Sequence, residues 1–335
     1  MPELPEILAA YGGIGYVVAP AGFGKTHLIA ASLCHAEKRQ LVLTHTYAGV
    51  NALRRKMRQV RAPNGAFRID TIASWALRLS LSYPEASGWN VERPDQEQWA
   101  GLYRSCSRLL ECSFIRRVLR ASYGGLYVDE YQDCSCAQHD IVLKIARDLP
   151  CRILGDPLQG IFDFDGEPVD WDRDVVAAFE PLGQLETPHR WERAGSPSLG
   201  SWLRDVRQAL ERGQPVDLTR APRDRVRFRI ADSDAAQLLM TQGNECRSVH
   251  CGPRDSVIAI HGGGPTYKAK CHRLAQTSRR NVRINRRDRG QGPVFLRAKG
   301  RTRQERPGPS EARGHPCRER HDWRQIEFAS WHRPR

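Results

Sequence analysis

Residues 19–26, APAGFGKT, form the stretch whose residue types and spacing imply a specific chemistry. Gly22 and Gly24 allow the backbone to turn its N–H groups toward an anion, where a Cβ would collide with the ligand. Lys25 would add a point charge at the β- and γ-phosphates of a nucleotide, and the Thr26 hydroxyl is a suitable ligand for Mg²⁺. The pattern therefore predicts a phosphate-binding loop for a nucleoside triphosphate.

The segments on both sides of this loop support the same prediction. Residues 16–18 are an apolar run of strand length, and apolar residues at helical spacing begin at Leu28. A strand, a loop and a helix in this order place the positive end of the helix dipole at the phosphates. A chance glycine-rich turn is the alternative, and Ala19 stands where the strict pattern has glycine. The residues expected to contact the nucleotide are Ala19, Pro20, Ala21, Gly22, Phe23, Gly24, Lys25 and Thr26.

A second candidate site follows the apolar run GLYVD at residues 125–129. Asp129 and Glu130 are adjacent carboxylates at the end of a predicted strand. Hydrolysis of a nucleoside triphosphate needs one carboxylate near Mg²⁺ and a second that orients and deprotonates water. We assign Asp129 to the metal and Glu130 to the water, with a solvated acidic loop as the alternative.

The element pattern predicts an α/β fold with a parallel sheet. Buried strands are expected at residues 40–44, 125–129 and 151–154, with helices at 48–61 and 96–119 between them. In such sheets, ligands bind beyond the carboxyl ends of the strands. Lys25, Thr44, Asp129 and Asp156 all fall at such ends.

We divide the chain into three parts. Residues 1–180 are predicted to be a nucleotide-binding domain with a helical insertion at about 83–120. Residues 181–240 would begin a second domain, which includes a possible strand at 184–187 and an amphipathic helix at 196–212. Residues 241–335 form a basic tail.

The net charge of +14 is confined to that tail. Residues 1–240 contain 30 Lys and Arg and 30 Asp and Glu, whereas residues 241–335 contain 22 and 8. Beyond residue 277 no apolar periodicity is present, so we expect no folded domain there; residues 256–262 alone have the pattern of a strand. Two interpretations remain open: a disordered cationic arm that binds nucleic acid, or the product of a shifted reading frame.

The composition argues against a membrane or secreted protein. No stretch approaches the ~20 apolar residues of a membrane span, and the N-terminus lacks the pattern of a secretory signal. The ten cysteines include no CxxC pair. Together with a nucleotide site, they favour reduced thiols and a cytoplasmic location.

The sequence VDEYQD at residues 128–133 resembles the box that follows the second acidic strand in superfamily 1 DNA helicases of the UvrD/Rep/PcrA type. Other boxes follow in the family's order. Residues 42–57, VLTHTYAGVNALRRKM, resemble motif Ia, and residues 70–75, DTIASW, are similar to the box that also borders DNA. The resemblance implies single-stranded DNA contacts at Thr44, His45, Thr46, Thr71 and Ser74.

Two further boxes resemble motifs III and IV. Residues 154–166, LGDPLQGIFDFDG, would place Gln159 at the γ-phosphate, and Phe162 and Phe164 would offer faces for base stacking. Residues 187–191, TPHRW, would place Arg190 at the γ-phosphate and His189 against the adenine. Taken alone, each of these boxes is also compatible with an ordinary turn, a surface arginine or a core aromatic pair.

The resemblance implies a RecA-like fold, the cofactors ATP and Mg²⁺, and ATP hydrolysis coupled to movement along single-stranded DNA. Asp163 and Asp165 depart from it, because the family usually has arginines there. Nothing after residue 200 resembles motifs V and VI, so the second RecA-like domain is expected to be partial and the motor incomplete. Three hypotheses follow: an ATP-dependent DNA helicase, a nucleotide-binding but motor-deficient remnant, or a DNA-binding protein acting through its basic tail. The involvement of a partner subunit, which the sequence does not identify, also remains open.

Overall fold

The computed structural model describes residues 3–160, 166–226, 234–248, 256–259, 282–284 and 296–299. The chain forms two compact units, Met1–Val226 and Arg227–Arg335. Each unit is described here by itself. Among the described residues, no helix has the length and apolar character needed to span a membrane.

A six-stranded sheet forms the centre of the first unit, and every strand pair in it is parallel. Its strands are β1 (Ile14–Val18), β2 (Gln40–Thr44), β3 (Phe67–Thr71), β4 (Gly125–Asp129), β5 (Cys151–Gly155) and β6 (Glu180–Gln184). The order across the sheet is β3-β2-β4-β5-β1-β6. The strands β2, β4 and β5 are buried along their whole length, as expected for a sheet that is covered on both faces.

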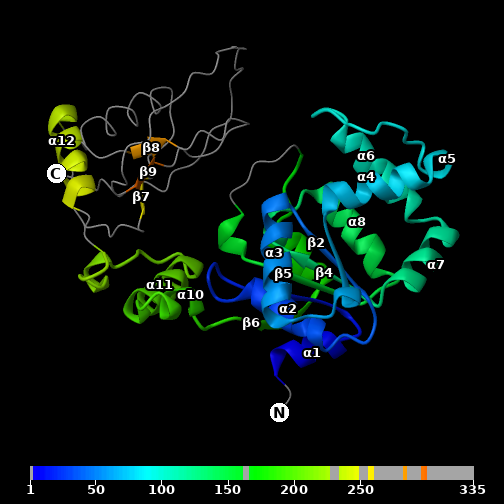
Figure 1. Cartoon of the computed structure of the whole chain (residues 1–335), viewed down its shortest axis with the longest axis horizontal. Helices are drawn as coiled ribbons and strands as arrows, with labels where there is room; N and C mark the ends of the chain where they lie inside the picture. The colour runs from blue at the N-terminus through cyan, green and yellow to red at the C-terminus, as the bar shows by residue number, and fades with distance from the viewer. Residues whose placement is uncertain are drawn as a thin grey trace. The chain divides into compact units, whose positions relative to one another are not determined.

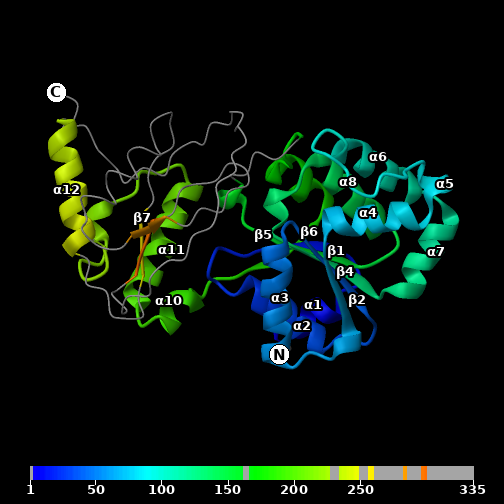
Figure 2. The same ribbon diagram turned by 45° about the horizontal axis from the view of Figure 1, so that its top comes forward.

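Helices cover both faces of this sheet (Figures 1 and 2). The helices of the first unit are α1 (Leu4–Ala10), α2 (Lys25–Cys34), α3 (Tyr47–Val60), α4 (Ile72–Ser82), α5 (Pro84–Ser87), α6 (Trp99–Leu109), α7 (Ser113–Ser122), α8 (Cys136–Ala146), α9 (Val176–Ala178), α10 (His189–Arg193) and α11 (Pro197–Glu211). One core joins the sheet to α1, α2 and α3, and the other joins it to α4, α6, α7 and α8. The α/β fold with a parallel sheet is therefore confirmed.

Two element predictions need correction. The helix predicted over 96–119 is two helices, because a turn after Leu109 redirects the chain so that Ile115 and Leu119 of α7 reach the core that α6 also enters. The strand expected at 184–187 is β6, which begins at Glu180 and pairs with β1. Its residues are mostly exposed because it lies at the edge of the sheet, so the alternation typical of a half-buried strand is absent. The first sheet thus continues past residue 180, and our division into domains remains a prediction.

The second unit is described only in part. It contains α12 (Ala235–Ser248) and a small antiparallel sheet in the order β7-β9-β8. Its strands are β7 (Ser256–Ala259), β8 (Val282–Ile284) and β9 (Leu296–Lys299). The run at 256–262 does contain the strand expected there. The sequence pattern predicted no strand beyond residue 277, and the structure differs at β8 and β9, which pair with each other as well as, through β9, with β7. The other residues after Ser248 lie outside the described residues.

Candidate nucleotide site and nucleic-acid interface

The loop between β1 and α2 has the backbone geometry of an anion cradle. Gly22 and Gly24 have φ angles of 83° and 103°, a region that side-chain-bearing residues rarely adopt. Gly24 caps α2 without a side-chain hydrogen bond, so the first turn of the helix keeps N–H groups available for an anion. The strand, loop and helix that the sequence predicts are all present.

Lys25 lies at the first position of α2 and is 6% exposed. Its ammonium group forms an ion pair with Glu130 and lies 3.9 Å from Asp129 Oδ1. Asp129 is the last residue of β4, and Glu130 follows in a left-handed conformation with φ 58°. That conformation is uncommon for a residue other than glycine, and it turns the Glu130 carboxylate toward the loop. The fold thus joins the two candidate sites, which are 105 positions apart in sequence.

The carboxyl groups near Lys25 differ in the direction in which the protein shifts their pKa. Burial raises the pKa of Asp129 to about 6, against the opposing charge of Lys25. Burial also acts to raise the pKa of Glu130, but the charge of Lys25 and hydrogen bonds from Gln132 and Lys25 leave that pKa below its ordinary value. Asp133 lies nearby, and burial followed by the charge of Glu130 raises its pKa to about 7. Of these three carboxyl groups, Glu130 therefore ionises at the lowest pH.

A chain of hydrogen bonds connects Glu130 to the segment after β5. Gln132 Nε2 donates to Glu130 Oε2 at 2.9 Å, and Gln132 Oε1 accepts the backbone N–H of Asp156 at 2.9 Å. The Asp156 carboxylate in turn accepts a hydrogen bond from the amide of Gln159. Gln159 is thereby connected to Glu130 through Asp156 and Gln132, and its contact with the γ-phosphate stays a prediction.

Asp156 has a second partner that the sequence does not indicate. Arg207 of α11 donates from Nη1 to Asp156 Oδ1 at 2.6 Å, and both side chains are buried, at 10% and 2% exposed. Glu211 Oε1 lies 2.7 Å from Arg207 Nε. Arg207 belongs to the polar part of an amphipathic helix, so nothing local marks it as buried.

The TPHRW segment packs directly on the phosphate-binding loop. The backbone N–H of Arg190 donates to the carbonyl oxygen of Gly22 at 2.9 Å. A Cβ on Gly22 would lie 2.7 Å from the Trp191 ring, and one on Gly24 would lie 3.3 Å from the His189 ring. The guanidinium of Arg190 lies over the Trp191 ring, 5.9 Å from its centroid. The sequence placed His189 and Arg190 at the nucleotide but did not single out Trp191, which touches the loop most closely.

The residues expected to contact DNA lie where β2 and β3 end, but their burial differs. Thr44 and Thr71 are buried, at 1% and 3% exposed. Thr71 Oγ1 accepts the backbone N–H of Ser74 at 3.0 Å and so caps α4. Thr46 is exposed, and its Oγ1 caps α3 through Gly49 N–H at 3.0 Å.

His45 lies inward, on the side of the acidic pair. Its Nε2 lies 3.3 Å from Cys134 Sγ, and burial lowers its pKa to about 4. Phe162 and Phe164 lie outside the described residues. The DNA contacts remain predictions.

Tyr47 is the aromatic side chain that the sequence reasoning missed at this edge. It is 71% exposed, and its hydroxyl is 2.8 Å from Ser74 Oγ, which joins the starts of α3 and α4. An exposed ring whose position is fixed by a hydrogen bond can stack on a base at little entropic cost. Its position directly after Thr46 is the signal that was available in the sequence.

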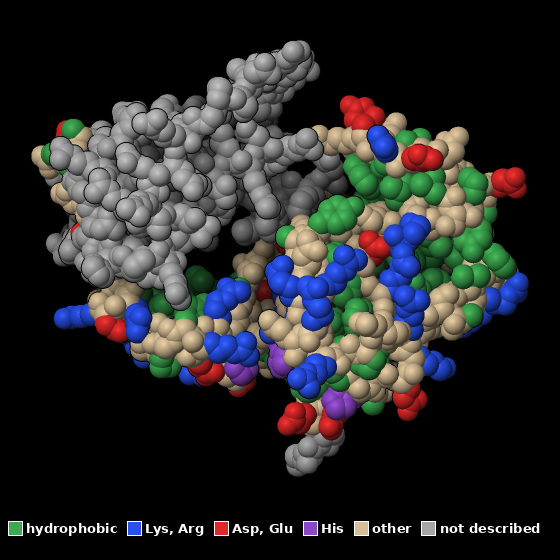
Figure 3. Space-filling model, viewed as in Figure 1, with side chains coloured by type: hydrophobic (Ala, Val, Ile, Leu, Met, Phe, Trp, Pro, Cys, Tyr) green, Lys and Arg blue, Asp and Glu red, His purple; other side chains and the backbone are tan. Residues whose placement is uncertain are grey.

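Basic side chains gather over α3 on the face shown in Figure 3. Arg54, Arg55 and Arg58 of this helix are exposed, while Leu53 and Met57 face the core. The cluster of basic residues on α3 is therefore the exposed face of an amphipathic helix. The same face also suits a phosphate backbone.

Mg²⁺ fits the residues at the loop. Thr26 follows Lys25 in the first turn of α2, and Asp129 is buried at the end of β4. Among the described residues, no group of three or more His, Cys, Asp or Glu side chains is arranged to hold a metal. Mg²⁺ commonly uses one or two protein ligands together with substrate phosphates and water, so two protein ligands suffice.

Residues 90–170 match the family model of the UvrD/REP helicase N-terminal domain. This segment is similar to the N-terminal domain of the UvrD/REP helicases. The match includes the acidic box and the Gln159 segment, and it falls within the first unit. A comparison with curated proteins gives no match.

Several solved helicases have a distant structural similarity to this chain. An arterivirus nonstructural protein 10 (helicase), solved with DNA, has a TM-score of 0.36 and 14% identity over 64% of this chain and 44% of its own. Pif1 helicase from Candida albicans has a TM-score of 0.31 and 13% identity over 79% and 58%. Pif1 from Bacteroides, in complex with ADP-AlF3 and single-stranded DNA, has a TM-score of 0.30 and 13% identity over 76% and 58%. The chain thus spans about half the length of these proteins.

Proposed function

We propose that the protein is an ATP-dependent DNA helicase of the UvrD type, which couples hydrolysis of ATP with Mg²⁺ to movement along single-stranded DNA. The observation that carries this proposal is the meeting of Lys25 with Asp129 and Glu130 at the mouth of an anion-binding loop. A lysine at a helix N-terminus with two carboxylates beside it supplies charged groups that phosphoryl transfer to water uses.

The residues of the site would have separate roles in binding and in hydrolysis. The N–H groups at the start of α2 and the ammonium of Lys25 would hold the β- and γ-phosphates, and Thr26 and Asp129 would hold Mg²⁺. The metal, when bound, neutralises charge that develops on the phosphates. Because Lys25 pairs with Glu130 in the structure, the γ-phosphate would compete for the ammonium and release the Glu130 carboxylate to accept a proton from water.

The remaining proposed roles concern nucleotide sensing and DNA. Gln159 would respond to the γ-phosphate through Asp156 and Gln132, which connect it to Glu130. Arg190 and His189 would approach the nucleotide from α10. Single-stranded DNA would cross the edge where Thr46, Tyr47 and Ser74 lie.

The test is ATP binding and turnover, with and without single-stranded DNA, in the unaltered chain and two variants. We expect Lys25→Ala to abolish ATP binding. We expect Glu130→Gln to retain binding and to lower kcat by about 100-fold or more, the usual contribution of a general base. Lys38→Ala and Glu37→Gln are the matched controls, because both side chains are exposed.

The outcomes separate the hypotheses. DNA-stimulated turnover that disappears in both site variants supports the helicase. Binding of ATP that depends on Lys25, without turnover above background, would indicate the motor-deficient remnant. The hypothesis of DNA binding through the tail alone is not favoured, because the first unit holds an intact phosphate-binding loop and acidic pair.

A further inference from the structure

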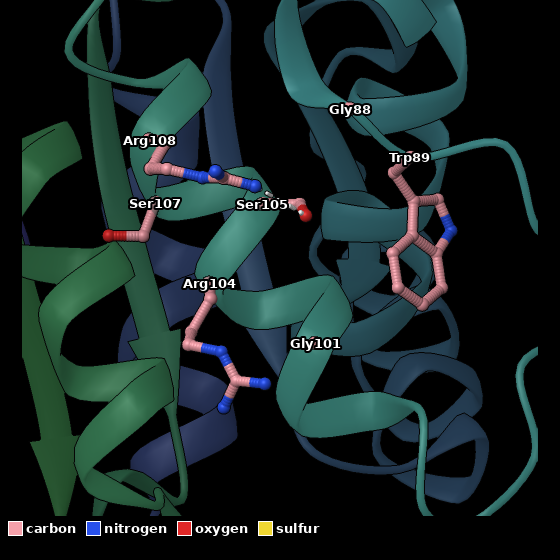
Figure 4. A pocket seen from close by; sticks show the side chains of 7 residues that line it. All are labelled: Gly88, Trp89, Gly101, Arg104, Ser105, Ser107 and Arg108. Carbon is pink, nitrogen blue, oxygen red and sulfur yellow. Dashed lines mark hydrogen bonds between the residues drawn. The ribbon is translucent and has the colours of Figure 1, made fainter.

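A pocket of about 540 Å³ lies on α6. None of the residues that line it belongs to the phosphate-binding loop or to the acidic pair. Its lining residues are Gly88, Trp89, Gly101, Arg104, Ser105 and Arg108, with Ser107 at its margin. Figure 4 shows Arg108 extending toward the side where Trp89 lies, and Ser107 pointing the opposite way. The volume falls within the range of small-molecule sites.

One wall of the pocket is the indole of Trp89. Gly88 ends α5 with φ 66° and turns the chain so that Trp89 faces α6. The ring is fixed by a hydrogen bond from its Nε1 to the carbonyl oxygen of Val91 at 2.8 Å. It lies close to the backbone of α6, since a Cβ on Gly101 would be 3.3 Å from it. The ring is half-buried, and a flat, fixed and accessible aromatic face is suited to stacking.

The other wall carries two positive charges. Arg104 and Arg108 are one helical turn apart on α6, and both are exposed. No carboxylate of the described residues pairs with either guanidinium; Arg108 Nη2 reaches only Ser105 Oγ at 3.4 Å and Ser87 O at 3.5 Å. Like charges at this spacing destabilise a helix slightly, and a bound anion would remove that cost.

We propose that this pocket binds one nucleotide unit of a single-stranded nucleic acid, with the base stacked on Trp89 and the phosphate between Arg104 and Arg108. An aromatic face opposite two unpaired guanidiniums matches a ligand that is both planar and anionic. The proposal rests on the proposed function only in that the ligand is nucleic acid. It assigns a second contact, in the helical insertion, for the strand that meets the edge of the sheet.

The first experiment measures binding of a fluorescent oligothymidylate to the full chain over a range of salt concentrations. We expect Arg104→Ala/Arg108→Ala to weaken binding about tenfold at low salt and to reduce the slope of log K against log salt by about 1. Arg117→Ala/Arg147→Ala is the matched control. It removes two exposed arginines without a pairing carboxylate from the same helical layer, on α7 and after α8. If the two double variants weaken binding equally, the pocket is not a specific site, and the loss reflects only the lower positive charge of the protein.

The second experiment tests the stacking. Trp89→Ala should weaken oligothymidylate binding about tenfold, whereas Trp89→Phe should retain most of it, because the phenyl ring still stacks. An abasic oligomer should show little dependence on Trp89 but full dependence on the arginines. Equal losses in Trp89→Phe and Trp89→Ala, or unchanged binding in both, would contradict the proposal; thermal unfolding of each variant identifies a folding defect.

Competition by dTMP and by inorganic phosphate identifies the source of the ligand. Weak competition by both compounds supports a polymer as the ligand. If dTMP instead binds as tightly as the oligomer, and the pocket variants lose that binding, the ligand is a free nucleotide and the proposal of a polymer is overturned. ATP binding is measured in parallel with Lys25→Ala. Oligomer binding that depends on the pocket, without ATP binding, would refute the proposed function alone. ATP binding that depends on Lys25, without any oligomer binding, would refute the pocket alone.

Discussion

At the scale of single residues, the candidate site is held by polar side chains whose partners are distant in sequence. Asp156 is 1% exposed and accepts hydrogen bonds from Gln159 and Arg207. Its carboxylate would be an uncompensated buried charge without the guanidinium. Arg207 therefore connects α11 to the segment that carries Gln159.

This contact predicts a large effect of Arg207→Met on stability. Breaking a buried ion pair by removing one partner costs about 3–5 kcal/mol, because the other charge stays buried. Denaturant unfolding followed by tryptophan fluorescence measures it, with the exposed Arg204→Met of the same helix as the control. Addition of Asp156→Asn should recover part of the loss. A loss below about 1 kcal/mol would show that the pair is not a stabilising contact.

Tyr47 gives a second prediction at the residue scale, at the edge that we propose to meet DNA. Tyr47→Ala should weaken binding of a single-stranded oligonucleotide by about 1–3 kcal/mol, the usual value of one stacked base. Tyr47→Phe should lose less, because it removes only the hydrogen bond to Ser74. Phe114→Ala is the control, since Phe114 is also an exposed aromatic side chain, 51% exposed on α7. An effect of similar size in the control would argue against a stacking role for Tyr47.

At the scale of elements, the layer formed by α4, α6, α7 and α8 is held by ion pairs as well as by its apolar core. Asp148, just after α8, pairs with Arg116 and Arg120 of α7. Its side chain is 2% exposed, while the arginines are 40% and 50% exposed. Hydrogen bonds from Arg116 hold the pKa of Asp148 below its ordinary value.

The sign of the pH dependence follows from that shift. Because the pKa is lower in the folded protein, the stabilisation is complete above the unfolded value of about 4 and is lost as the pH falls through the folded value. Asp148→Asn should therefore cost about 1–2 kcal/mol at neutral pH and progressively less below pH ~4. Thermal unfolding across pH measures this, with the exposed Asp172→Asn as the control. A cost that stays constant with pH would exclude an electrostatic origin.

At the scale of the whole molecule, charge and site belong to different units. Met1–Val226 contains 28 Lys and Arg and 28 Asp and Glu, whereas Arg227–Arg335 contains 24 and 10. The loop, the acidic pair, α10 and α11 all belong to the first unit. We therefore expect nucleotide binding and non-specific attraction to nucleic acid to be separable.

Truncation after Val226 tests this separation. We expect the shortened chain to bind ATP within about threefold of the full chain, a difference below 1 kcal/mol. Its oligonucleotide binding should have a shallower salt dependence, by about 0.7 in slope for each phosphate contact that the basic unit supplies. Loss of ATP binding in a shortened chain that unfolds cooperatively would mean that the second unit contributes to the nucleotide site.

The sequence alone determined the elements whose signals are local. The apolar run 40–44 coincides with β2, and GLYVD coincides with β4, because the buried strands of a parallel sheet are continuous apolar segments. The glycine-bearing loop and the helix after it were equally evident, since left-handed backbone and helix periodicity depend on adjacent residues. The chemistry of the candidate site could therefore be proposed from the residues between Ala19 and Glu130.

Only the tertiary structure decided which distant side chains meet. Arg152 interrupts the apolar run of β5, yet it is buried and donates to the carbonyl oxygen of Ala9 at 3.0 Å. The contacts of Trp191 with Gly22 and of Arg207 with Asp156 are equally non-local. Strand order and helix packing bring these residues together, and no periodicity within a window of sequence encodes that order. Local patterns identified the chemical groups, and the folded chain selected their partners.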